Sequence, residues 1–335
     1  MILVTGATGL IGSHLTLYLT RKGFDVRAVY RNETSINKTK KIFSLYESRP
    51  DELFNKIEWV QADITDITSL ENIFDNISHI YHSAALVSFD NRKREELHQT
   101  NVEGTANLLH LAQENRIKKF LHFSSIAVFG QYDKPITEKT HWNWKEKHSE
   151  YAVSKYLAEM EVWRASQEGL PVVIVNPSVV LGAGFWNEGT GKLFALIDKG
   201  MSYYPSGGNN FVDVWDVVKA STNLMQSNII NDSFIIGGHH SLYKELLSMI
   251  AESLNKKPPT RKIPYRLALT VAKLNGMFSK ITGKTMNLSP GVTRTLYQNP
   301  EYSSEKLLQS IRHTFIPLKA TITNISGQYQ KSLQK

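Results

Sequence analysis

Thr5-Gly6-Ala7-Thr8-Gly9-Leu10-Ile11-Gly12 is the stretch that decides the fold of this chain. It follows the apolar run Ile2-Leu3-Val4, which predicts a buried strand, and it opens a helical pattern. Gly6 permits a tight turn, Gly9 lets the backbone approach a diphosphate, and Gly12 lets the helix pack close to the strand. The free N–H groups at the helix start then favour phosphate. The predicted cofactor-binding residues of this loop are Gly6, Thr8, Gly9, Leu10, Ile11 and Gly12.

Strand and helix patterns alternate through the first 180 residues. Short apolar runs predict buried strands at residues 2–4, 26–30, 57–61, 79–82, 120–123 and 172–175. Helical patterns occupy residues 10–22, 67–74, 103–115 and 151–169. Such alternation predicts an α/β protein with a Rossmann-type, doubly wound parallel sheet.

The domain organisation follows from where this alternation weakens. We predict an NAD(P)-binding Rossmann domain over residues 1–180 and a smaller, mainly helical substrate-binding lobe over residues 181–335. Within the second part, residues 211–238 are expected to pack back on the first domain. The lobe would then close over the site.

Composition narrows the class of protein. The 335 residues include 41% hydrophobic residues, enough for a large core, and no cysteine, which excludes disulfides and thiolate chemistry. The net charge of +8 comes from scattered residues, and we expect no nucleic-acid partner. Residues 263–278 are broken by proline, glycine and charged residues, so they predict an amphipathic helix and no stable membrane insertion. The start of the chain lacks a signal-peptide pattern, and we expect a cytoplasmic protein.

The end of the second strand bears on the choice of cofactor. An acidic residue that grips the ribose of NAD is expected there, but the position holds Tyr30-Arg31. Arg31 can pair with a 2′-phosphate, so NADP is favoured over NAD. Glu33 could still reach a ribose hydroxyl, which keeps NAD as the alternative.

The ends of the third and fourth strands add further candidates. Asp63 and Ile64 follow the third strand, where the carboxylate could accept the adenine amino group or cap the next turn. Ala84 and Ala85 follow the fourth strand and are small enough for backbone to approach a cofactor. His82 just before them is predicted to be a core or capping histidine.

Tyr151 and Lys155 form the sharpest chemical feature, because residues at i and i+4 share one face of a helix. A lysine ammonium near a phenol would lower the phenol's pKa, and the tyrosine could then exchange a proton near neutral pH. Lys155 could also bind the nicotinamide ribose. Ser125, in the pair Ser124-Ser125 after the fifth strand, could hold a substrate carbonyl beside the tyrosine, although such a pair also suits a simple turn.

Together these motifs resemble the extended short-chain dehydrogenase/reductases, a group that holds nucleotide-sugar epimerases and dehydratases, dihydroflavonol-type reductases and 3β-hydroxysteroid dehydrogenases. The resemblance covers nearly the whole chain and includes the segments 5–12, 62–66, 101–105, 124–130, 176–182 and 210–214. It implies that Ser125, Tyr151 and Lys155 are catalytic and that Pro177, Ser178 and Val179 line the nicotinamide. It implies no metal. Asn101 is expected to have a structural role first.

The resemblance implies hydride transfer at a carbon bearing oxygen, and the residues favour one version of it. Dehydratases of this group carry an Asp-Glu pair after the catalytic hydroxyl residue, where this chain has Ile126-Ala127. Nucleotide-sugar epimerases often carry a basic residue where this chain has Gly207-Gly208-Asn209-Asn210. We therefore predict NADPH-dependent reduction of an aldehyde or ketone, or the reverse alcohol oxidation.

Two alternatives remain at this stage. One is a nucleotide-sugar 4-epimerase that retains NAD tightly, and the other is a non-catalytic dinucleotide-binding sensor or scaffold. Helices 103–115 and 151–169 are amphipathic, and in the resembling group they commonly form a dimer contact. We therefore expect a homodimer whose only other partner is a small carbonyl or alcohol substrate.

Overall fold

Seven parallel strands form the central sheet of the protein. The structure is a computed structural model that describes residues 1–130, 135–282 and 289–334, except for the side chains of residues 275–282. The order of the strands across the sheet is β10-β6-β5-β4-β1-β2-β3, and every neighbouring pair is parallel. The strands are β1 (Ile2–Thr5), β2 (Val26–Tyr30), β3 (Glu58–Gln61), β4 (His79–His82), β5 (Lys119–Phe123), β6 (Val172–Pro177) and β10 (Asp232–Ile236). This arrangement confirms the predicted doubly wound parallel sheet.

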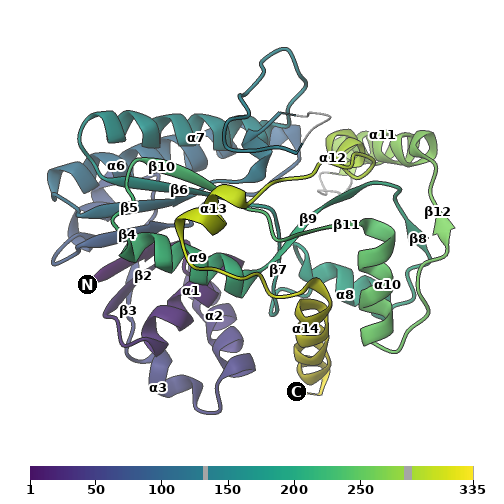
Figure 1. The fold of residues 1–335 in the computed structure, drawn as a ribbon, viewed down its shortest axis with the longest axis horizontal. Helices are drawn as coiled ribbons and strands as arrows, with labels where there is room; N and C mark the ends of the chain where they lie inside the picture. Colours follow the sequence, from purple (N-terminus) through teal and green to yellow (C-terminus); the bar gives the residue numbers. More distant parts are fainter. Residues whose placement is uncertain (131–134, 283–288, 335) are drawn as a thin grey trace.

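Helices connect the strands and build the lobe (Figure 1). In the described part of the chain they are α1 (Leu10–Arg21), α2 (Glu33–Tyr46), α3 (Pro50–Phe54), α4 (Ile67–Leu70), α5 (Arg94–His98), α6 (Gly104–Glu114), α7 (Glu150–Gln167), α8 (Gly191–Asp198), α9 (Val214–Gln226), α10 (Tyr243–Ser253), α11 (Tyr265–Thr282), α12 (Pro290–Thr295), α13 (Glu305–Ser310) and α14 (Leu318–Leu333). A π-helical turn, Gln99–Glu103, runs directly into α6.

The sheet is covered on both faces, because alternate side chains of each buried strand point to opposite sides. Ile2 and Val4 of β1 pack into the apolar cluster that α1 and α9 share, whereas Leu3 between them packs with α6 and α7. Figure 1 shows the same layering, with α6 and α7 on one side of the sheet and α1, α2 and α9 on the other. Because both faces of the sheet are covered, the strands are continuous apolar runs in the sequence.

The lobe is mainly helical and also contains two small sheets. The first has the order β11-β9-β7, formed by β7 (Val179–Leu181), β9 (Gly208–Asp213) and β11 (His239–Leu242). The second pairs β8 (Tyr203–Tyr204) with β12 (Arg261–Lys262). The chain passes from β9 in the lobe to α9 on the main sheet at Asp213, whose side chain caps α9 by accepting a hydrogen bond from the N–H of Trp215. Segment 211–238 therefore returns to the central sheet through α9 and β10.

No helix among the described residues has the length and apolar character needed to cross a membrane.

Candidate active site

A cavity of about 520 Å³ lies at the carboxyl ends of the parallel strands. It lies where open α/β sheets bind their ligands. Nine of the predicted cofactor-binding residues line it: Gly6, Thr8, Gly9, Leu10, Arg31, Asp63, Ile64, Ala84 and Ala85. Ile11 and Gly12 lie next to this lining, in the first turn of α1.

The three glycines of the loop have different packing roles. Gly6 has a φ of +68°, and a Cβ atom there would lie 2.5 Å from the backbone nitrogen of Ala84. A Cβ on Gly12 would lie 2.1 Å from the carbonyl oxygen of Gly6. At Gly9 the nearest atom to such a Cβ is 3.4 Å away, so the backbone there faces open space at the start of α1. The loop therefore fits a diphosphate, with N–H groups of the helix start available to it.

The end of the cavity that the sequence predicts to hold adenosine carries both proposed charged residues, Arg31 and Asp63. The Arg31 side chain is 61% exposed and lies 4.0 Å from Asp63. Asp63 lines the cavity, and its Oδ1 atom also accepts hydrogen bonds from the N–H and hydroxyl of Thr65. Ser35 and Lys38, from the first half of α2, line the same end and were missed by the sequence analysis. The sequence feature that could have indicated them is the polar start of a helix directly after Arg31.

Arg27, which lies in β2 four residues before Arg31, has a structural role. It is buried, and its Nη1 atom donates hydrogen bonds to the carbonyls of Ile73 and Asp75. Its Nη2 atom pairs with Glu58 at 2.9 Å. Arg27 thus joins β2 to neighbouring segments, and Arg31, directly after this strand, is the arginine that lines the cavity.

The catalytic candidates meet where β5 ends and α7 begins. Ser149 caps α7, since its side chain accepts a hydrogen bond from the N–H of Ala152. Tyr151 and Lys155 therefore lie in the first turns of the helix. The Ser125 hydroxyl accepts a hydrogen bond from the N–H of Ala127, and it also faces the Tyr151 phenol, whose pKa it lowers. The structure thus combines the turn and the tyrosine contact that the sequence proposed as alternatives for Ser125.

The pKa of Tyr151 differs from the sequence prediction. We expected the Lys155 ammonium to lower it, but burial of the phenol raises it, and the hydrogen bond with Ser125 opposes that rise. The physical reason is that desolvation penalises a phenolate strongly, while Lys155 is turned toward β5. Tyr151 is accordingly a protonated phenol at neutral pH.

The Lys155 side chain is buried against the end of β5. The residue is 2% exposed, and its Nζ atom donates to the carbonyl of Phe123 at 2.7 Å. It also lies 3.3 Å from Nε2 of His122. Because a lysine ammonium only donates, that nitrogen accepts. Burial lowers the pKa of Lys155 to about 8, and the charge of Glu159 opposes this shift.

Glu159 extends the catalytic face of α7 by one further turn. Its Oε2 atom accepts hydrogen bonds from the Ser124 hydroxyl at 2.7 Å and from the Asn176 amide at 3.0 Å. It therefore ties the ends of β5 and β6 to the helix that carries Tyr151. Burial raises its pKa. Sequence analysis missed this residue, although its position four residues after Lys155 placed it on the same face.

Asn101 and His82 have the structural roles that the sequence favoured. The Asn101 side chain accepts from the N–H of Leu86 at 2.7 Å and donates to the Ser154 hydroxyl at 2.9 Å. Asn101 therefore joins Leu86 of the cavity lining to Ser154 of α7, which lies between Tyr151 and Lys155 in the sequence. His82 is fully buried and bonds to the hydroxyls of Thr5 and Thr105.

Apolar side chains stand beside the tyrosine. The rings of Phe89 and Tyr151 lie 5.6 Å apart, and Phe89 remains 42% exposed. Val87, which lines the cavity, is 62% exposed. Sequence analysis missed both residues, although their position shortly after Ala84-Ala85 could have indicated that they lie near the cavity. Trp142, by contrast, packs with its ring stacked on His148 and Tyr156.

The segment predicted to line the nicotinamide lies at the junction of the sheet and the lobe. Pro177 ends β6 and Val179 begins β7. Ser178 between them is buried, and its hydroxyl donates to the carbonyl of Gly237 at 2.8 Å. The Ser178 side chain is therefore used to join β6 to the segment after β10.

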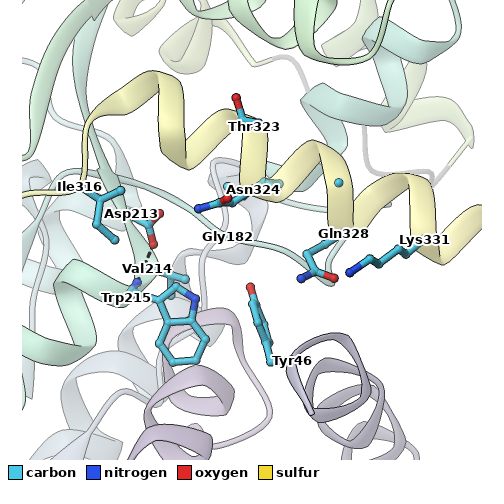
Figure 2. A pocket seen from close by; sticks show the side chains of 12 residues that line it. Tyr46, Gly182, Asp213, Val214, Trp215, Ile316, Thr323, Asn324, Gln328 and Lys331 are labelled. Carbon is cyan, nitrogen blue, oxygen red and sulfur yellow. Dashed lines mark hydrogen bonds between the residues drawn. The ribbon is translucent and has the colours of Figure 1, made fainter. Parts of the chain in front are cut away.

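A second cavity of about 410 Å³ lies between α14 and the ends of α2 and α9 (Figure 2). Figure 2 shows the rings of Tyr46 and Trp215 beneath α14, with Gln328 and Lys331 above them. The Tyr46 hydroxyl lies 3.2 Å from Nε2 of His14. This cavity is lined by none of the predicted cofactor-binding residues, whereas the cavity at the strand ends is lined by nine of them. Neither lining includes Ser125, Tyr151 or Lys155. The candidate active site is therefore the cavity at the strand ends together with the catalytic candidates at the end of β5 and the start of α7.

Comparisons with known proteins identify the family and the fold. Residues 2–237 match the model of a family described as the NAD dependent epimerase/dehydratase family. A putative dihydroflavonol 4-reductase from Synechocystis sp. is 29% identical over 319 residues, which cover 92% of this chain and 88% of that protein. Sterol demethylase protein B from Methylococcus capsulatus is 28% identical over 276 residues, covering 81% and 80%. A UDP-glucuronic acid 4-epimerase from Bacillus cereus, solved with NAD, shares the fold with a TM-score of 0.77 at 19% identity, covering 98% and 96%.

Proposed function

The chain belongs to the NAD dependent epimerase/dehydratase family, and from that premise we propose that it reduces an apolar aldehyde or ketone with NADPH. The observation that carries the proposal is the Tyr151 phenol. A tyrosine phenol is protonated at neutral pH and burial raises the pKa of this one further, so Tyr151 holds the proton that a carbonyl reduction needs beside Ser125 and the ring of Phe89. The exposed ring of Phe89 beside it suits an apolar substrate.

Each catalytic candidate then has a distinct task. When bound, the nicotinamide would supply the hydride to the carbonyl carbon. Tyr151 donates its phenolic proton to the carbonyl oxygen, and Ser125 holds that oxygen beside the phenol. Lys155 lies one helical turn along the same face, but its ammonium is held at the carbonyl of Phe123, so its task is to position the cofactor ribose. Two of its three N–H donors are used by Phe123 and His122, which leaves one for a ribose hydroxyl.

The preference for NADPH rests on the adenosine end of the cavity. Arg31, Ser35 and Lys38 offer two cations and a hydroxyl to a 2′-phosphate. Two carboxylates of the same cavity compete for these cations, since Asp63 lies 4.0 Å from Arg31 and Glu188 lies 3.2 Å from Lys38. The preference for NADP therefore rests on Arg31, which stands where a ribose-binding carboxylate is expected for NAD.

A nucleotide-sugar 4-epimerase is the second candidate, and the family includes such enzymes by its name. One observation weighs against it. A Cβ on Gly207 would lie 2.2 Å from the carbonyl oxygen of Gln298, and one on Gly208 would lie 2.2 Å from Asn299. These two positions have no room for a basic side chain that would hold a sugar-nucleotide diphosphate.

The test is turnover by the purified protein. We expect NADPH oxidation with aromatic or aliphatic ketones and aldehydes, and we expect the site to be empty of dinucleotide as purified. Tyr151→Phe should abolish turnover and leave NADPH binding intact. Tightly retained NAD with interconversion of UDP-sugars would establish the epimerase instead. Dinucleotide binding without turnover on broad carbonyl and alcohol panels would establish a sensor or scaffold.

A further inference from the structure

The positive charge of the chain is concentrated in one segment of the lobe. Residues 253–300 contain nine of the 39 basic residues and none of the 31 acidic residues. The rest of the chain therefore has 30 basic and 31 acidic residues, which nearly cancel. The whole net charge of +8 arises from this segment, which includes β12, α11 and α12.

In its described part, residues 265–274, helix α11 exposes three large apolar residues and buries two small ones. Leu267, Val271 and Leu274 are 56%, 42% and 50% exposed, and their spacing places them on one face of the helix. The face toward the protein carries Ala268 and Ala272, which are 8% and 0% exposed. A helix that only served its own fold would show the opposite distribution. The outward stripe is therefore suited to a partner.

Cations and aromatic rings border this stripe. Arg266 and Lys273 on α11 and Arg261 and Lys262 on β12 are all exposed. No carboxylate in the described ranges pairs with any of these four cations, although ion pairs are frequent elsewhere on the surface. The guanidinium of Arg261 lies over the exposed ring of Tyr203, 5.9 Å from its centroid. Unpaired cations beside tyrosine and leucine have the composition of a membrane-interface helix.

We propose that this face, defined by Tyr203, Arg261, Lys262 and the exposed side of α11 from Arg266 to Leu274, docks the protein on an anionic lipid bilayer. The apolar stripe enters the boundary between headgroups and acyl chains, and the cations bind lipid phosphates and carboxylates. Figure 1 places α11 at the outer end of the lobe, away from the central sheet, so the helix can lie flat on a surface. A nucleic acid would satisfy the cations but would leave the leucine and valine side chains without a partner.

The experiment is sedimentation of the full chain with vesicles of phosphatidylcholine alone or mixed with phosphatidylglycerol. We expect binding only to the mixed vesicles. Leu267→Gln with Leu274→Gln should weaken binding roughly tenfold or more, because two apolar contacts are lost. Arg266→Gln with Lys273→Gln should weaken it about fivefold for each charge removed. Added salt should weaken binding of the unaltered protein.

Matched controls remove exposed residues of the same kinds elsewhere. Leu308→Gln with Leu333→Gln removes side chains that are 45% and 62% exposed, and Lys118→Gln with Lys145→Gln removes two exposed cations. Both controls should bind vesicles as the unaltered protein does. The proposal is overturned if the mixed vesicles are not bound, if the α11 variants bind equally well, or if light scattering shows that the leucine variant only breaks self-association. Binding of a polyanion such as heparin that the leucine variant retains, without vesicle binding, would also overturn it.

Discussion

Lys155 and Phe123 are joined by a 2.7 Å hydrogen bond from the lysine ammonium to the main-chain carbonyl of the phenylalanine. Phe123 ends β5 two residues before Ser125, and Lys155 follows Tyr151 by one turn of α7. The bond therefore ties the element that carries the serine to the element that carries the tyrosine. It also buries the cation, which is why its pKa falls to about 8.

This burial predicts an alkaline limit to activity. Lys155 is charged below its pKa and neutral above it, so turnover that needs the cation should fall as the pH rises through about 8. The measurement is kcat and kcat/KM from about pH 6 to about pH 10. Lys155→Met should remove most activity at every pH. A rate that stays level through about pH 9 would contradict the assignment.

Glu159 sets the position of that limit. Glu159→Gln keeps an oxygen that can accept from Ser124 and Asn176 but removes the charge that raises the pKa of Lys155, so the alkaline limb should move to lower pH. Glu159→Ala leaves both donors unpaired and should lower the free energy of unfolding by about 2–3 kcal/mol in urea denaturation. Glu161→Gln, on the exposed face of the same helix, is the control and should shift neither quantity. If the alkaline limb of the pH–rate profile stays at the same pH in Glu159→Gln, the role of Glu159 is structural only.

The loop glycines separate folding from binding. Gly9→Ala adds a Cβ that meets no atom closer than 3.4 Å, so the protein should fold with a normal Tm but lose affinity for dinucleotide. Gly12→Ala places a Cβ 2.1 Å from a carbonyl oxygen and should lower the Tm itself. Thermal unfolding and NADPH titration of both variants decide the matter. Normal NADPH affinity in Gly9→Ala would show that the diphosphate does not lie over this residue.

Arg31 should discriminate between the two dinucleotides. Arg31→Ala removes a charge-assisted contact with the 2′-phosphate, so the Kd for NADPH should rise roughly tenfold or more and that for NADH should stay nearly the same. Fluorescence titration measures both. Arg49→Ala removes another exposed arginine, at the start of α3 and outside the cavity lining, and serves as the control. Equal changes for the two cofactors would remove the basis for the NADP preference.

Phe89 should determine the size and polarity of the substrate. Phe89→Ala opens the apolar wall beside Tyr151, so kcat/KM for an aromatic carbonyl should fall roughly tenfold. The loss should appear mainly in KM, and a small aliphatic aldehyde should be reduced as before. Ile230→Ala, an exposed apolar change before β10, is the control. A uniform loss of kcat for every substrate would point instead to displacement of the tyrosine.

Local sequence patterns predicted the positions of the catalytic candidates on their elements but not their pKa shifts. The spacing of Tyr151 and Lys155 implies a shared helical face, and the structure has that face. The expected fall in the Tyr151 pKa was wrong, because the direction in which Lys155 turns depends on the carbonyl of Phe123. That carbonyl is 32 residues away in the chain, and no local pattern encodes its approach. The roles of Glu159 and Phe89 were missed for the same reason.

By itself, the sequence determined the parallel α/β fold, the glycine loop and the positions of Ser125, Tyr151 and Lys155. These features depend on periodicity, turn chemistry and strand ends, which act over a few residues. The tertiary structure alone decided how each of these groups is charged, which residues surround the cavity and which face of α11 is left outside. Burial and hydrogen bonding between distant segments set those properties, because desolvation depends on what the folded chain brings together in space.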